Sequence, residues 1–388
     1  MLIDNDIHEG SRMNKLTISN INVSTHCIPL KRPYKVANQY FEIVDMIQVH
    51  IETKEGVTGF GTGTLANFLT GEILSESLKA LNEFNLEPIL GRPLESPEQA
   101  IELIESAFIN TPAALAAIDI ALYDAFAKSE KKSLLDYLGQ HHTALPTSVT
   151  IGIKDTLEDA LIELKEYVDA GFKAIKIKVG GTNLQSDITL LQEVKRRIPR
   201  DTHLYVDPNQ GYSFEECIKF IQKTHDLGIA FLEQPVSVDD APLLASLNDK
   251  LKEFICLDES LMHHQTAAEW EQYDSFPGHI FNIKLMKCGG ITNASKIARI
   301  AKRNQIKLMF GCMDESCASI SAALNFAYSQ PHTRFIDLDG SFDLQEDLFK
   351  GGFELKNGLM YPIKKPGLGV TPFKTETVKK TKKQPEPA

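Results

Sequence analysis

Three acidic residues, each at the end of an apolar run, have the spacing of ligands to one divalent cation. The runs HLYVD, AFLE and FICLD end at Asp207, Glu233 and Asp258, which are 26 residues (207 to 233) and 25 residues (233 to 258) apart. Each run predicts a buried strand, because it is rich in Val, Ile, Leu, Phe or Tyr and turn-forming residues follow it at once. Parallel strands joined by helices bring their C-terminal ends side by side, so three carboxylates can converge on one hard cation. The sequence therefore predicts a site for one Mg²⁺ per subunit.

Lysines flank the three acids and could move a proton. Lys176 and Lys178 alternate in AIKIKVGG, so both point to the same face of one strand. In FNIKLMKCGG, Lys284 rather than Lys287 has the depth and parity of an interior residue. A carboxylate substrate chelated to a divalent cation has a more acidic α-proton, because the metal stabilises the enediolate that forms. A neutral lysine can remove that proton, and nearby cations favour the neutral form. We expect Lys178 and Lys284 to act on opposite faces and to invert the carbon.

The same spacing continues in both directions along the chain, which indicates a barrel. Amphipathic helical patterns separate the candidate strands, for example at residues 156–170, 184–198, 213–227 and 293–304. Eight strands alternating with helices are typical of an α/β barrel, whose chemistry lies at the C-terminal ends of its strands. The candidate strands are Ser148 to Ile153, Ala174 to Val179, His203 to Asp207, Ala230 to Glu233, Phe254 to Asp258, Phe281 to Leu285, Lys307 to Phe310 and Arg334 to Asp337.

A second domain is expected before the barrel, because 388 residues exceed the roughly 250 of a typical barrel. We place it at residues 14–140, with alternating strand patterns at 16–23 and 43–52 and helical patterns at 70–85, 96–108 and 112–128. The barrel then occupies residues 141–345, and the Gly-rich segment 346–374 returns to the first domain. Residues 1–13 form an extension, and residues 375–388, rich in Lys and Pro, predict a disordered tail.

Composition favours a small-molecule enzyme of the cytoplasm. A net charge of −11 and a pI near 5.5 argue against binding to nucleic acid or to an anionic membrane surface. We find no apolar run of about 18 residues, as a membrane span needs, and the polar, acidic start does not resemble a signal peptide. Six cysteines without a CxxC pair fit reduced, buried thiols.

The motifs KIKVG, DPNQG, EQP, DES and NIKLMKCGG, in this order and spacing, resemble the muconate-lactonizing subgroup of the enolase superfamily. The segment AAIDIALYDAFAK is also similar to one common in that superfamily. The resemblance covers nearly the whole chain. It implies a (β/α)7β TIM-type barrel with an α+β capping domain formed by the N-terminal part and the C-terminal segment, and it implies self-association into a homo-oligomer. Dipeptide epimerases, muconate cycloisomerases, o-succinylbenzoate synthases and N-acylamino acid racemases share this set of acids and lysines.

Two aspartates on the last strand favour one of these activities. Asp337 and Asp339 in RFIDLDGSF resemble the DxD motif with which dipeptide epimerases bind the free ammonium group of their substrate. Two carboxylates in a dry pocket require a cation, which a dipeptide provides and muconate does not. The alternative is that both aspartates only cap the following turn. The leading hypothesis is an L-Ala-D/L-Glu epimerase that inverts the α-carbon of the C-terminal residue by 1,1-proton transfer.

The resemblance also implies contacts for other residues. Lys176 would contact the substrate carboxylate and tune Lys178, whereas Asn209 and Glu259 would orient the metal ligands. Further substrate contacts would come from Thr150, Cys312 and Asp314.

Two positions depart from the alanyl-glutamate pattern. Gln39 stands where an arginine can bind the glutamate side chain, and Asp314 stands where that pattern has an apolar residue. An acid at position 314 could favour cationic or amine-rich ligands. Three alternatives therefore stay open: a dipeptide epimerase of other specificity, a cycloisomerase or o-succinylbenzoate synthase, and a metal-binding barrel without catalytic activity.

Overall fold

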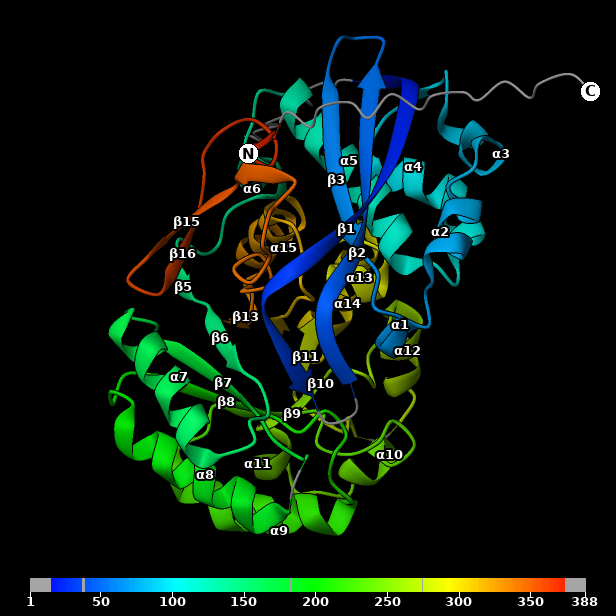
Figure 1. The fold of residues 1–388 in the computed structure, drawn as a ribbon. Helices are drawn as coiled ribbons and strands as arrows, with labels where there is room; N and C mark the ends of the chain where they lie inside the picture. Colours follow the sequence, from blue (N-terminus) through cyan, green and yellow to red (C-terminus); the bar gives the residue numbers. More distant parts are fainter. Residues whose placement is uncertain (1–14, 37–38, 182, 274, 374–388) are drawn as a thin grey trace, which may run out of the picture.

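The computed structural model describes residues 15–36, 39–181, 183–273 and 275–373, with the side chains of Val36 and Gln39 left out. It consists of a parallel barrel and a capping domain (Figure 1). The predicted terminal segments 1–13 and 375–388 lie outside the described residues. Within the described part, no helix is both long and apolar enough to cross a membrane.

The barrel has eight parallel strands, which pair in the order in which they occur in the sequence. An isolated parallel bridge between Thr147 and Ile336 joins the first strand region to the last. This confirms the predicted fold class. The strands are β6 (Ser148–Ile151), β7 (Ala174–Lys178), β8 (His203–Asp207), β9 (Phe231–Glu233), β10 (Ile255–Leu257), β11 (Ile280–Ile283), β12 (Lys307–Phe310) and β13 (Thr333–Ile336).

Helices connect the strands and cover the outside of the barrel (Figure 1). Side chains cap the N-termini of most of these helices, although α10, α13 and α14 have no such cap. Ser213, for example, forms a capping box with Glu216 at the start of α9, which satisfies backbone N–H groups that the helix itself cannot. The connecting helices are α7 (Leu157–Asp169), α8 (Leu184–Arg197), α9 (Phe214–Thr224), α10 (Ala241–Leu244), α11 (Asp249–Lys252), α12 (His264–Trp270), α13 (Leu285–Cys288), α14 (Ile291–Arg303) and α15 (Cys317–Ser329).

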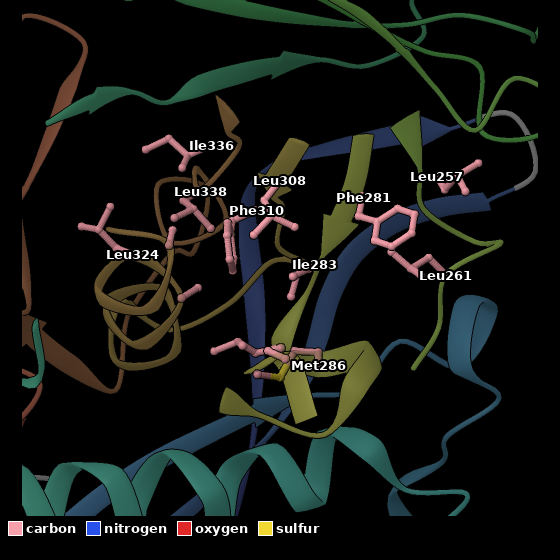
Figure 2. Packing of buried hydrophobic residues seen from close by; sticks show 14 of the residues in the cluster. Leu257, Leu261, Phe281, Ile283, Met286, Leu308, Phe310, Leu324, Ile336 and Leu338 are labelled. Carbon is pink, nitrogen blue, oxygen red and sulfur yellow. The ribbon is translucent and has the colours of Figure 1, made fainter. Parts of the chain in front are cut away.

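Side chains along each barrel strand point alternately to an outer core under the helices and to the barrel interior. Phe281 and Ile283 of β11 face outward and join the large apolar cluster under the helices (Figure 2). Their neighbour Ile280 faces the interior, where it packs with Tyr205, Phe231 and other residues of a small apolar cluster. This inner cluster closes the barrel at the N-terminal ends of the strands. Residues two and four positions further along each strand must therefore line the interior at the C-terminal ends.

The capping domain is a four-stranded antiparallel sheet packed on helices (Figure 1). Gly59, Gly61 and Gly63 of β3 face α5, and a Cβ atom on any of them would lie about 2 Å from a backbone oxygen of that helix. Glycine is thus required for this close packing. The elements are β1 (Leu16–Val36), β2 (Gln39–Thr53), β3 (Thr58–Thr64), β4 (Pro93–Leu94), α1 (Asn67–Thr70), α2 (Leu74–Ala80), α3 (Glu83–Leu86), α4 (Pro97–Ile104), α5 (Pro112–Ser129) and α6 (Leu134–Leu138).

The C-terminal segment returns to the capping domain, as the fold class predicted. The Leu368 amide donates a hydrogen bond of 2.8 Å to Asp124 of α5, and Phe349 packs edge-on against Phe60 of β3. The segment forms β14 (Phe349–Gly351), β15 (Phe353–Lys356), β16 (Leu359–Pro362) and β17 (Val370–Pro372), and β16 pairs with β5 (Leu145–Pro146).

The capping sheet differs from the sequence prediction in three ways. β1 continues to Val36 and β2 begins at Gln39, so the two form a hairpin far longer than the predicted strands at 16–23 and 43–52. Polar residues and two prolines conceal this continuation, and the pairing register shifts between Pro29 and Tyr34. Strand β3 was not predicted, because its alternating glycines weaken the strand pattern. The helix expected at residues 70–85 is instead α2 and α3 with a break between them.

Candidate active site

The candidate site lies in the barrel interior at the C-terminal ends of the strands. The three predicted metal ligands and the three predicted lysines lie two or four residues beyond a member of the inner apolar cluster, as Lys176 and Lys178 follow Ala174, and Asp207 follows Tyr205. Because side chains alternate along a strand, these charged residues lie on the same inner face as the apolar cluster, nearer the C-terminal ends of the strands. A pocket above them is lined by Thr150, Lys176, Lys178, Asn209, Asp258, Glu259, Lys284, Cys312, Asp314, Asp337 and Asp339, among others.

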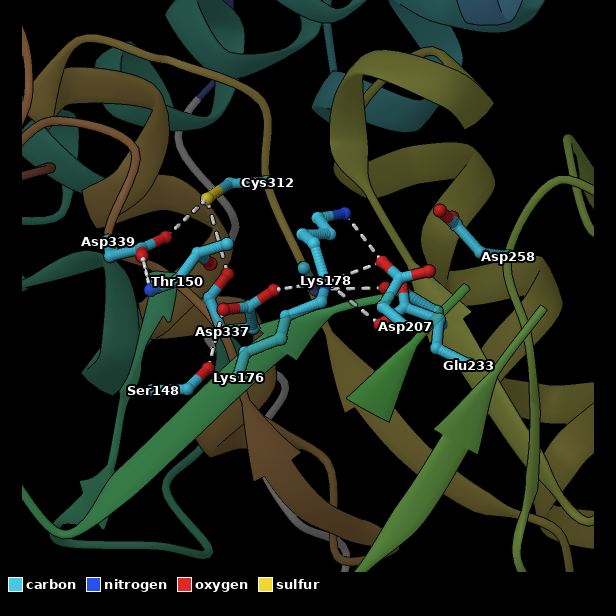
Figure 3. Close-up of polar contacts among 12 residues, drawn as sticks. Ser148, Thr150, Lys176, Lys178, Asp207, Glu233, Asp258, Cys312, Asp337 and Asp339 are labelled. Atoms are coloured by element: carbon cyan, nitrogen blue, oxygen red, sulfur yellow. Dashed lines mark hydrogen bonds and ion pairs between the residues drawn. The ribbon is translucent and has the colours of Figure 1, made fainter. Parts of the chain in front are cut away.

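The three predicted metal ligands are fully buried and close to one another. Asp207 and Glu233 have no exposed surface, and Asp258 is 1% exposed. Lys176 Nζ lies 3.1 Å from Asp207 Oδ2, 2.8 Å from Glu233 Oε2 and 2.9 Å from Asp337 Oδ2. Figure 3 shows its side chain between Asp337 on one side and Asp207 and Glu233 on the other. One buried ammonium group thus links the predicted metal ligands to the predicted ammonium-binding pair.

The two predicted proton-transfer lysines contact different acids. Lys178 Nζ donates to Asp207 Oδ2 at 2.6 Å and to Asn209 Oδ1 at 2.8 Å. Lys284 Nζ donates to Asp258 Oδ2 at 2.8 Å. Lys178 is at the end of β7 and Lys284 directly follows β11, four strands further along the barrel sheet. The two ammonium groups therefore approach the three acids from opposite sides of the barrel.

Crowding of carboxylates perturbs the pKa values of the site. Burial and the neighbouring Asp207 raise the pKa of Glu233 to about 7, against the opposing effect of Lys176. Burial also acts to raise the pKa of Asp258, but Lys284 and Lys287 outweigh it and hold this pKa well below its usual value. Burial acts to lower the pKa of Lys284, but the attraction of Asp258 and Glu233 together outweighs it and raises this pKa above its usual value. Three acids in a site this dry require compensating positive charge.

The residues fit a hard divalent cation. Asp207, Glu233 and Asp258 offer carboxylate oxygens, which Mg²⁺ prefers, and Glu233 Oε2 accepts no hydrogen bond of good geometry although Lys176 is near. Among the described residues, no three His, Cys, Asp or Glu side chains already form a metal cluster, because ammonium groups stand between the carboxylates. Mg²⁺ would compete with these lysines for the same oxygens.

The aspartates of the last strand lie beside β6. Asp337 accepts hydrogen bonds from Lys176 and from the Ser148 hydroxyl, and Asp339 accepts one of 2.9 Å from the Thr150 amide. Burial and the nearby Asp337 raise the pKa of Asp339 to about 8. Cys312 donates its thiol to the carbonyl of Asp337. Asp339 therefore has no ammonium partner of its own among the described residues, unlike Asp337.

The tip of the β1–β2 hairpin (residues 30–36 and 39–43) forms one wall of the pocket. Tyr34 donates a hydrogen bond of 2.9 Å to Asp314 Oδ2 and stacks on Phe41, which packs against Phe68. Asp343 and Glu163 also line this side. The predicted contact of Gln39 falls on a side chain outside the described residues.

Two buried residues of the site were not among the predicted ones. Asn282 donates to Glu233 Oε1 at 2.8 Å and accepts from the Gly311 amide. Its position two residues before Lys284 on an alternating strand is a signal that could have identified it. Lys287 contacts Asp258 from α13 and has 2% of its surface exposed. Strand parity does not apply to it because it follows the end of β11. Of the predicted orienting residues, Asn209 Nδ2 donates a hydrogen bond of 3.4 Å to Glu259 Oε1, and both residues line the pocket.

Comparison with known proteins identifies the family. Residues 19–139 match the model of the mandelate racemase/muconate lactonizing enzyme N-terminal domain, and residues 159–376 match the enolase C-terminal domain-like model. An L-Lys-D/L-Arg epimerase from Desulforapulum autotrophicum is 40% identical over 92% of this chain and 99% of its own length. The L-Ala-D/L-Glu epimerase of Bacillus subtilis is 31% identical, over 92% of this chain and 97% of its own length.

Solved structures agree with these relatives. A dipeptide epimerase from Methylococcus capsulatus, complexed with Mg and the dipeptide L-Arg-D-Lys, superposes with a TM-score of 0.86 at 38% identity, covering 91% of this chain and 99% of that one. The chain belongs to the enolase superfamily. Its relatives place the chain in the dipeptide epimerase family of this superfamily, and these enzymes are isomerases.

Proposed function

We propose that this protein is a Mg²⁺-dependent epimerase of dipeptides with cationic side chains, and that it acts by 1,1-proton transfer between Lys178 and Lys284. The observation that carries the proposal is the placement of these two lysines on opposite sides of three buried carboxylates in one barrel interior. A proton removed on one face of the α-carbon and returned on the other inverts the configuration. Placement of both groups in one rigid interior supports such a two-sided transfer.

Asp207, Glu233 and Asp258 would hold the Mg²⁺. When bound, the ion supplies positive charge to the substrate carboxylate and so makes the α-proton easier to remove. Lys176 contacts two of these acids and Asp337, which suits it to bind the same substrate carboxylate. Lys178 and Lys284 hold and move the proton. Asn209 accepts a hydrogen bond from Lys178 and thereby fixes the direction of its ammonium group.

Asp339, with Asp337, would bind the α-ammonium group of the dipeptide. The raised pKa of Asp339 reflects burial beside a like charge, which a cationic ligand would relieve. A cycloisomerase substrate without an ammonium group would leave this carboxylate uncompensated. The site therefore favours a dipeptide over the substrates of the cycloisomerase and o-succinylbenzoate synthase alternatives.

Acidic residues on the outer wall support cationic side chains on the substrate. Asp314 accepts a hydrogen bond from Tyr34 and, within the described part of the chain, forms no ion pair with an ammonium group, although Lys178 lies near enough to lower its pKa. Asp343 lies on the same wall. The exposed Arg32 is paired with Glu166, and Lys154 is paired with Glu163. Two curated relatives are named L-Lys-D/L-Arg epimerases, which agrees with this charge pattern.

L-Ala-D/L-Glu, the leading substrate from the sequence, is the alternative. A glutamate side chain would face Asp314 and Asp343, and like charges in a partly buried pocket repel. The described wall offers it Arg32 and Lys154, each already paired with a glutamate. The choice between the two substrates is thus a question about the charge of one wall of the pocket.

The test is exchange of the α-proton in deuterium oxide. The purified enzyme with Mg²⁺ is incubated separately with L-Lys-L-Arg, L-Ala-L-Glu and L-Leu-L-Tyr, and ¹H NMR follows loss of the α-proton signal. We expect the cationic dipeptide to exchange and epimerise fastest. Faster reaction of L-Ala-L-Glu would reject the cationic specificity alone. No exchange with any dipeptide would reject the epimerase itself.

A further inference from the structure

Lys287 is a buried cation that the proposed proton transfer does not use. Its Nζ donates to the carbonyl oxygen of Asp258 at 2.7 Å and to the carbonyl oxygen of Asn282 at 3.1 Å, and it contacts Asp258 Oδ1 at 2.5 Å. It does not line the pocket, whereas Asp258 and Lys284 do. Lys287 therefore reaches Asp258 from behind, on the side away from the substrate.

The two oxygens of Asp258 are divided between two lysines. Lys287 binds Oδ1, and Lys284 binds Oδ2. Three hydrogen bonds from one ammonium group to a carboxylate and two backbone carbonyls fix the rotation of the Asp258 side chain relative to its own main chain. Oδ2 is then the oxygen presented to the pocket.

The turn that carries Lys287 is fixed by the capping domain. Gly289 and Gly290 follow α13 with positive φ angles, and a Cβ atom on Gly290 would collide with Asp119 of α5. Asp119 in turn accepts hydrogen bonds from the backbone amides of Ile291 and Thr292 at the start of α14. The KCGG segment thus has little freedom to move, and neither has the lysine at its start.

We infer that Lys287 is a positioning residue for the third metal ligand, holding Asp258 so that Oδ2 faces the cation. The inference rests on the proposed Mg²⁺ site but not on the identity of the dipeptide. A buried lysine without a function is costly, since its charge must be taken out of water. Groups that orient metal ligands typically contribute about 10- to 100-fold to metal affinity.

Loss of the Lys287 charge and loss of its contact with Asp258 predict opposite changes in Mg²⁺ affinity, which makes the inference testable. Removing a positive charge near a cation site strengthens cation binding by Coulomb's law. Loss of an orienting contact weakens it. Weaker Mg²⁺ binding by Lys287→Met would therefore come from lost positioning, because the charge effect has the other sign.

A tryptophan close to Asp258 allows Mg²⁺ binding to be followed by fluorescence. Trp270 is the only tryptophan, and its indole N–H donates to the carbonyl of Ser260 at 3.0 Å, two residues from Asp258. We propose to titrate metal-free protein with MgCl₂, following Trp270 fluorescence and, in parallel, the heat of binding by calorimetry. Neither readout needs substrate or turnover.

Lys287→Met should raise the Mg²⁺ dissociation constant about 10- to 100-fold. The matched control is Lys252→Met, since Lys252 is another buried lysine, 3% exposed, whose ammonium group contacts Ser275 and Asp249 instead of the site. The control should bind Mg²⁺ as the wild type does. Lys287→Gln, which keeps one donor for Asp258, should fall between the wild type and Lys287→Met.

Equal or tighter Mg²⁺ binding by Lys287→Met would overturn the inference and leave the proposed function intact. Absence of Mg²⁺ binding by the wild type would instead reject the metal site and this inference together. If Lys287→Met and Lys287→Gln both fail to fold while Lys252→Met folds, Lys287 has a structural role and the inference is wrong.

Discussion

The barrel interior and the β1–β2 hairpin line the same pocket but are held in place by different forces. In the interior, fully buried carboxylates each contact a lysine ammonium group, and removing one partner of such a pair typically costs about 3–5 kcal/mol. The hairpin tip is held on the barrel by backbone hydrogen bonds, such as Ile153 to Lys35, and by the exposed ion pair of Arg32 and Glu166. An exposed pair contributes only about 0–1 kcal/mol.

The firmly held interior suits the proposed proton transfer, and the weakly held hairpin suits selection of the substrate's side chains. Residues that move the proton have to be rigid, because a small displacement of the reacting groups slows the reaction strongly. Residues that select the side chains can sit on a weakly held segment, whose sequence can change without unfolding the barrel. Substitutions of the proton-transferring lysines in the interior should therefore affect kcat most, and substitutions at the hairpin should affect KM.

The largest effect is expected from Lys284→Ala. General acid–base groups typically contribute about 10²- to 10⁴-fold, so epimerisation should fall by that range with an unchanged fold. Polarimetry measures epimerisation, and ¹H NMR in deuterium oxide measures exchange of the α-proton. Lys307→Ala is the control, because Lys307 begins β12 at the opposite end of the barrel. Residual exchange of one epimer alone would assign the face served by Lys178, whereas full epimerisation would contradict the assignment.

Asp339→Asn should have the next largest effect. The variant keeps an oxygen for the Thr150 amide but loses the charge that would bind the substrate ammonium group. A hydrogen bond to a charged group contributes about 1.5–3 kcal/mol, so KM for the preferred dipeptide should rise about 10- to 100-fold. An N-acetylated dipeptide lacks this charge and should react equally poorly with both proteins. An unchanged KM for the free dipeptide would favour the alternative in which the aspartates only cap a turn.

The charge of the outer wall should be visible as a pH dependence. Burial and the nearby Asp343 raise the pKa of Asp314 to about 6, although the Tyr34 hydroxyl opposes them. As the pH falls through about 6, Asp314 takes up a proton and loses its attraction for a cationic side chain. KM for L-Lys-L-Arg should therefore rise below pH 6, by at most about tenfold per pH unit, relative to KM for L-Ala-L-Glu.

Asp314→Asn is the control for this titration and should abolish the difference between the two pH profiles. Its stability gives an independent check. A carboxyl whose pKa is raised on folding stabilises the fold below its unfolded pKa and loses that contribution as the pH rises through the folded value. Asp314→Asn should thus have a higher Tm than the wild type at pH 8 and a smaller advantage at pH 4. The same advantage at both values would exclude titration of Asp314.

The interior was predictable because local rules determine it. Lys176, Asp207 and Asp258 sit at fixed parity near the ends of apolar strands, so strand period and barrel topology suffice to bring them together. The same rule did not predict Lys287, because this residue lies on a short helix after the strand. The direction of its side chain depends on a glycine turn packed against Asp119.

The hairpin was not predictable from such rules. Tyr34 meets Asp314, 280 positions further along the chain, and no local pattern specifies a contact of that kind. The continuation of β1 past Pro29 is also set by pairing with β2 rather than by strand propensity. For this reason the sequence left alanyl-glutamate as the leading substrate, whereas the folded wall brings several acids together.

The smallest effect is expected at the contact between the two regions. Tyr34→Phe removes the hydroxyl that binds Asp314 but keeps the ring that stacks on Phe41. One hydrogen bond contributes about 0.5–1.5 kcal/mol, so KM for the cationic dipeptide should rise about two- to tenfold with little change in kcat.

The same substitution should shift the pH profile in a definite direction. Since the Tyr34 hydroxyl lowers the pKa of Asp314, its removal should move the midpoint of the KM profile to higher pH. Tyr40→Phe is the matched control, because Tyr40 lies on the same hairpin with 60% of its surface exposed. A fall in kcat as large as that of Lys284→Ala would mean that the hairpin positions the reacting groups, and the separation of chemistry from specificity would fail.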